Sequence, residues 1–155
     1  MSVTVRPARA EDHPVLVEYN SRLAQESEGK ALPHDILSRG VAAVLRDANR
    51  GRYWVAEIAG EVVGQLMVTL EWSDWRDGWL WWIQSVYVRA DARRAGVFRA
   101  LYANLVEEAR RQGDVVGLRL YVEHHNEAAQ ATYKRLGMVD AGYLVLERCP
   151  LEVER

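Results

Sequence analysis

The chain has 155 residues, of which 49% are hydrophobic and 27% charged, and its formal net charge is −2. A chain of this length and composition folds as one ordinary domain, here spanning residues 1–155, and is neither disordered nor fibrous. The nearly balanced charge argues against a nucleic-acid-binding face, and no apolar run is long enough to cross a bilayer. With Cys149 as the single cysteine no internal disulfide can form, and we expect a cytoplasmic protein.

Apolar periodicity predicts the elements of the first half of the chain. An alternating run at Val3–Arg6 indicates a short strand. Apolar residues spaced three and four apart predict helices over residues 10–25 and 35–48. Two alternating runs, residues 53–58 and 62–72, are joined by a tight turn and indicate a hairpin.

The strand predicted at Leu80–Val88 has no polar face, which is typical of a central strand covered by helices on both sides. We expect its tryptophans, Trp81 and Trp82, to fill the core. A helix from Val97 to Arg111 and a strand at 117–123 follow, and this order implies a parallel return. A short helix capped by Asn126 and a last strand, Tyr143–Arg148, end the chain. The fold class is therefore α/β of the α+β type: a mixed, mostly antiparallel sheet of six to seven strands with helices on both faces.

A basic turn separates the strand at Leu80–Val88 from the helix that follows. Arginines surround the turn, and Gly96 lets the backbone lie flush against a ligand because it has no Cβ. The start of the helix adds unpaired N–H groups and a partial positive charge. A solvated basic turn is the common alternative, but the strand-to-helix position favours a phosphate site. The arginines are Arg93, Arg94 and Arg99.

Several motifs occur together in order, and in this combination the chain resembles the GNAT superfamily of N-acetyltransferases. They are Val86-Tyr87-Val88, Arg93-Arg94-Ala95-Gly96-Val97-Phe98, Leu120-Tyr121-Val122-Glu123 and the stretch from Asn126 through Tyr133 to Met138. Phe98 stands where the family's turn usually has a small residue. The resemblance covers most of the chain and implies the fold described above, with acetyl-CoA as the acyl donor.

The resemblance also implies roles for particular residues. Pantetheine would lie along Val86 and Val88, a backbone N–H near Val86 would stabilise the oxyanion, and Tyr133 would act as general acid. A core tyrosine is the alternative for Tyr133, and a helix cap for Asn126. The residues expected to bind the cofactor are Val86, Val88, Arg93, Arg94, Ala95, Gly96, Val97, Phe98, Arg99, Asn126 and Tyr133.

More than one group could serve as the general base. Glu71 and Glu123 are candidates, and a chain of water molecules would serve equally well. We favour Glu71 because it precedes a tryptophan-rich turn that could form the mouth of a substrate pocket. Glu71 and Trp75 are therefore the expected substrate-binding residues.

We expect acetyl transfer to the primary amine of a small molecule. The alternatives are a non-catalytic acyl-CoA sensor and an acetyltransferase acting on a protein N-terminus or lysine. No metal site is expected, since the four histidines lack ligand spacing with the cysteine. No nucleic-acid or membrane partner is expected either. An exposed aromatic hairpin would make a homodimer possible.

Overall fold

The structure is a computed structural model that describes residues 2–152. The chain divides into two compact units, one ending at Tyr121 and the other beginning at Val122. Each unit is described by itself. Among the described residues, no helix combines the length and apolar character needed to span a bilayer.

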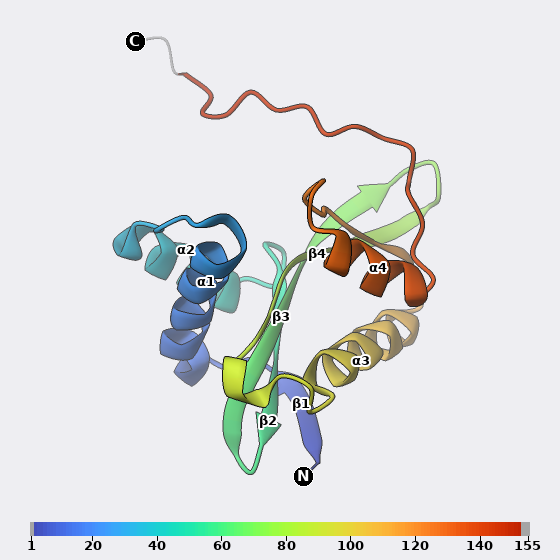
Figure 1. The fold of residues 1–155 in the computed structure, drawn as a ribbon. Helices are drawn as coiled ribbons and strands as arrows, with labels where there is room; N and C mark the ends of the chain where they lie inside the picture. The colour runs from blue at the N-terminus through green and yellow to red at the C-terminus, as the bar shows by residue number, and fades with distance from the viewer. Residues whose placement is uncertain (1, 153–155) are drawn as a thin grey trace. The chain divides into compact units, whose positions relative to one another are not determined.

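Five strands form a single sheet in the first unit (Figure 1). They are β1 (Val3–Pro7), β2 (Arg52–Ile58), β3 (Glu61–Ser73), β4 (Gly78–Val88) and β5 (Val115–Leu120). Each lies beside its neighbour in the chain; β1 to β4 pair antiparallel, and β5 pairs parallel to β4. This confirms the antiparallel strands predicted before the basic turn and the parallel return predicted after it.

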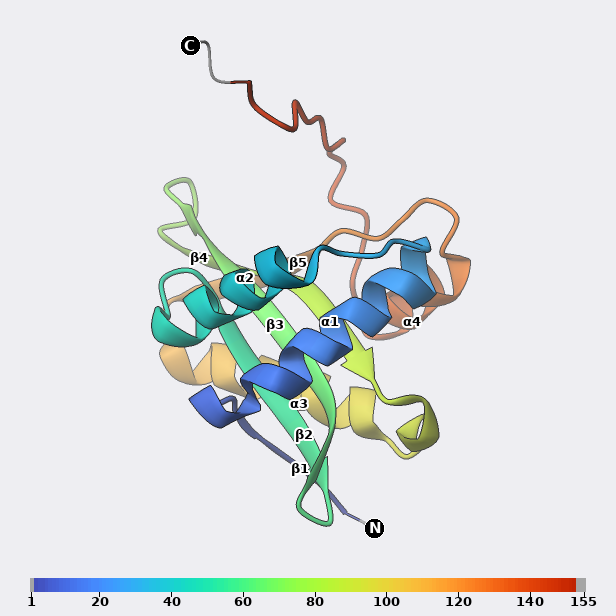
Figure 2. The same cartoon turned by 90° about the vertical axis from the view of Figure 1, so that its left-hand side faces the viewer.

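Helices cover both faces of this sheet, as the sequence predicted. α1 (His13–Glu28) and α2 (His34–Arg46) pack on one face, whereas α3 (Val97–Gln112) packs on the other (Figures 1 and 2). Short 3-10 turns, Ala10–Asp12 and Ala90–Ala92, lie just before α1 and before the basic turn. β4 is covered on both sides over most of its length and carries no charged residue.

The core consists of two apolar layers, one on each face of the sheet. The α3 layer contains Trp81, which is 1% exposed and packs against Trp54 with ring centroids 5.8 Å apart. The layer under α1 and α2 is smaller and centres on Leu16 and Val55. Trp82 is only partly buried, so the prediction that it fills the core was wrong.

The second unit contains one helix, α4 (Glu127–Arg135), in which no residue is buried. The strand predicted at Tyr143–Arg148 is absent: this segment has no regular secondary structure in the described chain. The sheet therefore has five strands rather than six to seven. Apolar alternation supplies the side chains of a strand, but a strand also needs a neighbouring edge for its backbone hydrogen bonds, and sequence pattern does not report that edge.

Candidate active site

β4 extends beyond the end of its partner β5. The last parallel pair joins Ile83 to Leu120, whereas β4 continues to Val88. Its opposite edge remains paired with β3 throughout this part. The end of β4 therefore has one edge that no described strand occupies, and this edge leads into the basic turn.

Backbone groups of Val86 and Val88 face the open edge. The N–H of Arg89 donates to the carbonyl of Val63 at 2.8 Å, so it points toward β3. Backbone groups along a strand alternate between its two edges, so those of Val88 and Val86 point away from β3. The Nε of Arg93 reaches the carbonyl of Val88 from that side at 2.9 Å. An extended ligand can pair with the remaining groups as an added strand would.

A bulge at Gln84 marks the point where the open edge begins. The register between β3 and β4 shifts there, because Ile83 pairs with Val68 but Ser85 pairs with Met67. The extra residue interrupts the alternation of side chains between the two faces. Both faces of β4 are apolar, so no shift in a polar–apolar alternation reveals this bulge in the sequence.

The bulge changes which face the end of β4 presents to each helix. Val86 and Val88 pack in the α3 layer together with Trp81. Tyr87 lies on the opposite face, where its ring centroid is 5.1 Å from that of Tyr19 on α1. Strict alternation along β4 would put Tyr87 on the face of Trp81, and the bulge reverses this.

The basic turn has an unusual backbone at two positions. Arg94 has φ = 69° and Gly96 has φ = 81°. The left-handed region is strained for an arginine, and such strain concentrates at binding sites. Alternating left-handed residues turn successive N–H groups toward one side and form an anion-binding concavity. Gly96 is also the N-cap of α3, so the unpaired N–H groups of the first helical turn follow immediately.

The side chains around the turn differ in burial: one is buried in the core, and the others lie at the surface. Val97 is 2% exposed and anchors the start of α3 in the core. Phe98 lies on the helix surface, with its ring centroid 6.2 Å from that of Tyr102. Arg94, Ala95 and Arg99 are exposed. No ion pair joins Arg94 or Arg99 to a carboxylate among residues 2–152, so both are available to an anionic ligand.

Arg93 is directed away from the turn and toward α1. Its Nη2 contacts the Glu26 carboxylate at 3.1 and 3.2 Å, and its guanidinium carbon lies 5.5 Å from the ring centroid of Tyr87. Hydrogen bonds from Tyr87 and Arg93 hold the pKa of Glu26 below its ordinary value. Sequence reasoning placed Arg93 on a phosphate and did not anticipate this partner on α1, 67 residues away.

Glu71 belongs to a cluster farther along the sheet. Arg119 of β5 donates from Nη1 to Glu71 Oε1 at 3.1 Å and lies 5.9 Å from the ring centroid of Trp82. The Trp82 ring stacks on Tyr121 at 4.5 Å. The cluster lies on the face that α1 and α2 cover only in part, and sequence reasoning missed the contribution of Arg119.

Neither expected substrate residue lies beside the open edge. Glu71 pairs in register with Leu80, six residues before Val86, which is about 20 Å at roughly 3.3 Å per residue. Trp75 is 89% exposed in the turn between β3 and β4, farther still from Val86. The structure therefore does not bring Glu71 or Trp75 together with the end of β4.

The two expected site residues of the second unit both belong to α4. Asn126 is its N-cap, and its Oδ1 accepts from the N–H of Ala129 at 3.1 Å. This fixes the start of the helix, as a capping asparagine should. Tyr133 lies in the second turn of the same helix and is partly buried.

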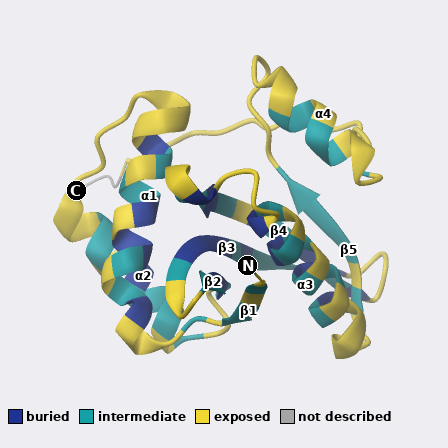
Figure 3. Cartoon of the chain, turned by 60° about the horizontal axis from the view of Figure 1, so that its bottom comes forward, coloured by how far each residue is buried: buried dark blue, intermediate teal, exposed yellow. Residues whose placement is uncertain are grey.

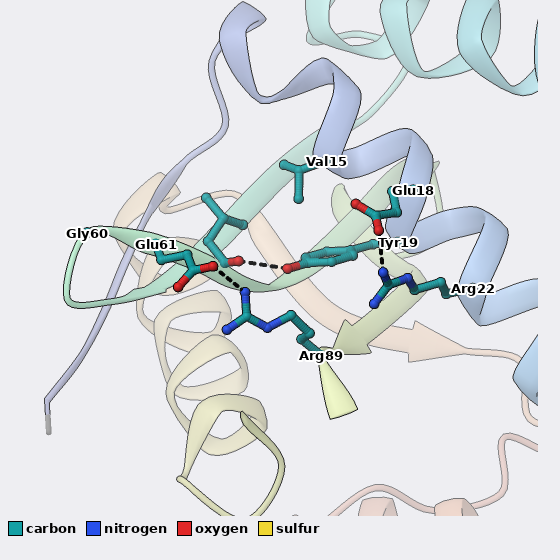
Figure 4. A pocket seen from close by; sticks show the side chains of 8 residues that line it. Val15, Glu18, Tyr19, Arg22, Gly60, Glu61 and Arg89 are labelled. Atoms are coloured by element: carbon teal, nitrogen blue, oxygen red, sulfur yellow. Dashed lines mark hydrogen bonds and ion pairs between the residues drawn. The ribbon is translucent and has the colours of Figure 1, made fainter. Parts of the chain in front are cut away.

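A cavity of about 450 Å³ lies between α1 and the turn joining β2 to β3 (Figure 4). Arg89 contacts Glu61 at 2.6 Å, and Arg22 pairs with Glu18. The Tyr19 hydroxyl donates to the carbonyl of Val62 at 2.7 Å. The charged side chains here neutralise one another, so we assign no ligand to this cavity.

An open strand edge that runs into an anion-binding turn suits an extended thioester carrying a pyrophosphate, as in acyltransferases that use coenzyme A. The chain belongs to the acetyltransferase (GNAT) family, whose model matches residues 16–138. This family uses acetyl-CoA as acyl donor, so the protein is an N-acetyltransferase, as the motifs predicted.

Individual relatives agree with this assignment. The chain is 29% identical over 149 residues to an L-methionine sulfoximine/L-methionine sulfone acetyltransferase from Pseudomonas paraeruginosa, covering 93% of this chain and 84% of that protein. It is 41% identical to a possible acetyltransferase from Clostridium difficile 630, with a TM-score of 0.92 and coverage of 98% and 100%. An integron cassette protein from the mobile metagenome of Cole Harbour Salt Marsh is 30% identical, with a TM-score of 0.81 and coverage of 96% and 91%.

Proposed function

We propose that this enzyme transfers an acetyl group from acetyl-CoA to the primary amine of a small molecule by direct attack in a ternary complex. The observation that carries the proposal is the open edge of β4 after Ile83, which continues without a break into the basic turn. The same stretch thus offers hydrogen bonds for an extended amide chain and then a concavity for its pyrophosphate.

The donor would be held mainly by backbone groups. Val86 and Val88 would pair with the pantetheine amides, and the N–H groups from Arg94 to Arg99 would bind the pyrophosphate. Arg94 and Arg99 would add charge-assisted hydrogen bonds. Arg93 would act through the position of the turn, because its guanidinium already contacts Glu26 and Val88.

Three events complete the transfer. The amine nitrogen bonds to the acetyl carbonyl carbon, and the resulting oxyanion accepts a hydrogen bond from the N–H of Val86, which faces the open edge. The carbon–sulfur bond then breaks, and the hydroxyl of Tyr133 gives its proton to the leaving thiolate. The acetylated nitrogen loses its second proton, which restores the Tyr133 hydroxyl and leaves a neutral amide. The attacking ammonium first loses a proton, and we assign this step to water, because Glu71 is paired with Arg119 far along the strand.

The acceptor would lie beside the open end of β4, on the sheet face that carries the rings of Trp82 and Tyr121. Aromatic rings suit the apolar part of a small amine. The Pseudomonas relative is named for two methionine derivatives, and both are α-amino acids. We therefore infer a small α-amino acid as the acceptor class.

Isothermal titration with acetyl-CoA tests the donor site. Gly96→Asp introduces a negative charge into the turn and should weaken binding at least about tenfold. Gly113→Asp is the matched control: Gly113 has φ = 82° at the other end of α3, and at neither glycine would a Cβ meet an atom within 4 Å. Equal losses in the two variants would overturn the donor site, because backbone strain alone would then explain them.

Release of free thiol over a panel of amino acids, other amines and peptides tests the reaction. We expect turnover on an amino acid, and Tyr133→Phe should lower kcat by about 100-fold while the affinity for acetyl-CoA stays unchanged. Binding without turnover on any amine would indicate a sensor. Turnover confined to peptides would indicate a protein acetyltransferase.

A further inference from the structure

Gln84 is the extra residue of the bulge in β4, and it is the one exposed residue of that strand. Its neighbours in β4 are buried or partly buried, as are Met67 and Val68 of β3 opposite the bulge (Figure 3). A bulge leaves its extra residue out of the strand pairing and redirects its side chain. Neither core packing nor strand pairing therefore explains an amide side chain at this position.

The side chain of Gln84 lies on the same face of the sheet as the Trp82 ring. Its Nε2 donates to the hydroxyl oxygen of Thr69 at 2.9 Å. Thr69 pairs in register with Trp82, and paired residues of neighbouring strands share a face. The hydrogen bond thus holds the amide of Gln84 on the face where the acceptor would lie.

One hydrogen-bonding atom of this amide remains free. The Oε1 of Gln84 has no hydrogen-bond partner among residues 2–152. The adjacent Ser85 differs, because its hydroxyl exchanges hydrogen bonds with Gln65, which is 0% exposed. Gln65 and Ser85 therefore satisfy each other inside the protein. Gln84 instead presents an acceptor oxygen at the surface, and its own Nε2 holds that oxygen in place.

The position of Gln84 along β4 suits contact with the attacking amine. Gln84 stands two residues before Val86, whose N–H would hold the acetyl oxygen, and two residues of strand span about 7 Å at roughly 3.3 Å per residue. A nitrogen that attacks the acetyl carbon approaches it to about 3–3.5 Å. The nitrogen then lies between Val86 and Gln84, within reach of a glutamine side chain.

We propose that Oε1 of Gln84 accepts an N–H of the acceptor amine and directs its lone pair toward the acetyl carbon, and that Thr69 fixes the orientation of this amide. The inference rests on the proposed acetyl transfer and adds the group that holds its acceptor. An ammonium and a neutral amine both carry N–H groups, so the hydrogen bond persists when the amine loses a proton to water before the attack. Gln84 thus contacts substrate, and Thr69 is a positioning residue.

Steady-state kinetics in which the amine and acetyl-CoA are varied separately test this role. The probe is the amine with the highest kcat/KM in the panel of amino acids, other amines and peptides. Gln84→Leu removes the acceptor oxygen and should lower kcat/KM for this amine about tenfold, while the affinity for acetyl-CoA stays unchanged. Gln112→Leu is the matched control: it makes the same change at an exposed glutamine at the end of α3 and should alter neither quantity.

Gln84→Glu keeps an acceptor oxygen and shows which end of the substrate the amide holds. Its kcat/KM for the amine should stay within about threefold of the wild type or rise, because a carboxylate also accepts an N–H. A loss as large as that of Gln84→Leu would overturn the proposal. It would mean that the amide N–H binds a carboxylate of the substrate, which an added negative charge repels.

Thr69 is tested by its coupling to Gln84. Thr69→Val removes the hydroxyl and should lower kcat/KM for the amine about threefold, whereas Thr69→Ser keeps the hydroxyl and should restore it. Combined with Gln84→Leu, Thr69→Val should have no further effect, because no amide remains to be oriented. Losses that multiply in the double variant would overturn the positioning role of Thr69.

Two outcomes separate this inference from the proposed function. Absence of turnover by the wild type on every amine would overturn the acetyl transfer and, with it, the role of Gln84. Turnover by the wild type, with kcat/KM for the amine unchanged in Gln84→Leu, would overturn the role of Gln84 alone.

Discussion

The guanidinium of Arg93 makes three contacts that tie the basic turn to β4 and α1. It hydrogen-bonds the end of β4 at Val88, pairs with Glu26 on α1 and lies over the ring of Tyr87. These contacts fix where the basic turn begins. An arginine beside a turn was evident from the sequence, but its partner on α1 was not, because no local pattern relates residues so far apart.

If Arg93 acts by holding the turn, its effect should depend on Glu26. Arg93→Ala and Glu26→Ala should each weaken acetyl-CoA binding about threefold, the scale of a half-exposed ion pair, and the double variant should bind no worse than either. Glu28→Ala, which alters another exposed glutamate at the end of α1, is the control and should change nothing. Tighter binding in Glu26→Ala would instead mean that Arg93 contacts phosphate directly.

Asp12 is a second residue whose charge organises the fold. Its carboxylate accepts from Arg6 at 2.8 and 3.0 Å and from the N–H of Arg9 at 2.7 Å, and its side chain is 8% exposed. Arg6 also pairs with Glu57 of β2. Hydrogen bonding from Arg6 holds the pKa of Asp12 below its ordinary value, although burial opposes this.

The lowered pKa predicts a pH-dependent stability. Because the folded-state pKa is below the unfolded one, the stabilisation is complete above the unfolded pKa of about 3.9 and is lost as pH falls through the folded value. Asp12→Asn should reduce the free energy of unfolding by about 2 kcal/mol at neutral pH. Urea unfolding should show this difference shrinking as the pH falls below the unfolded pKa of about 3.9, whereas Asp35→Asn, in an exposed pair, should have little effect at any pH.

At the scale of elements, α3 approaches the sheet closely where β3 carries Gly64. A Cβ on Gly64 would lie 2.9 Å from a methyl group of Val97 and 3.0 Å from the carbonyl oxygen of Tyr87. Gly64 pairs with Val88, so this contact lies directly behind the end of β4. The glycine thus sets the distance between the start of α3 and the open edge.

Two glycine-to-alanine substitutions should therefore change the free energy of unfolding in opposite directions. Gly64→Ala should lower the free energy of unfolding by about 1–3 kcal/mol, because the carbonyl of Tyr87 cannot move aside as a side chain can. Gly40→Ala, in the exposed interior of α2 with nothing within 4 Å, should raise it by about 0.5–1 kcal/mol. Chemical denaturation measures both, and a stabilised Gly64→Ala would show that the contact is loose.

The sequence predicts elements of this kind well where local pattern determines them. The strand-turn-helix that carries the basic turn was located because a continuous apolar run ends at Val88 and apolar residues spaced three and four apart begin near Val97. The bulge at Gln84 could not be found, because a register shift depends on the partner strand and both faces of β4 are apolar. The ion pair of Glu71 with Arg119 likewise required the pairing of β4 with β5.

At the scale of the whole molecule, the last predicted strand has the amino-acid composition of a strand but not its structure. Residues 143–148 have the apolar run of a strand but form no regular secondary structure in the described chain. A sequence specifies which side chains favour a sheet, whereas a strand also needs a neighbouring edge that receives its backbone hydrogen bonds. Local pattern therefore predicts the composition of a strand but not its pairing.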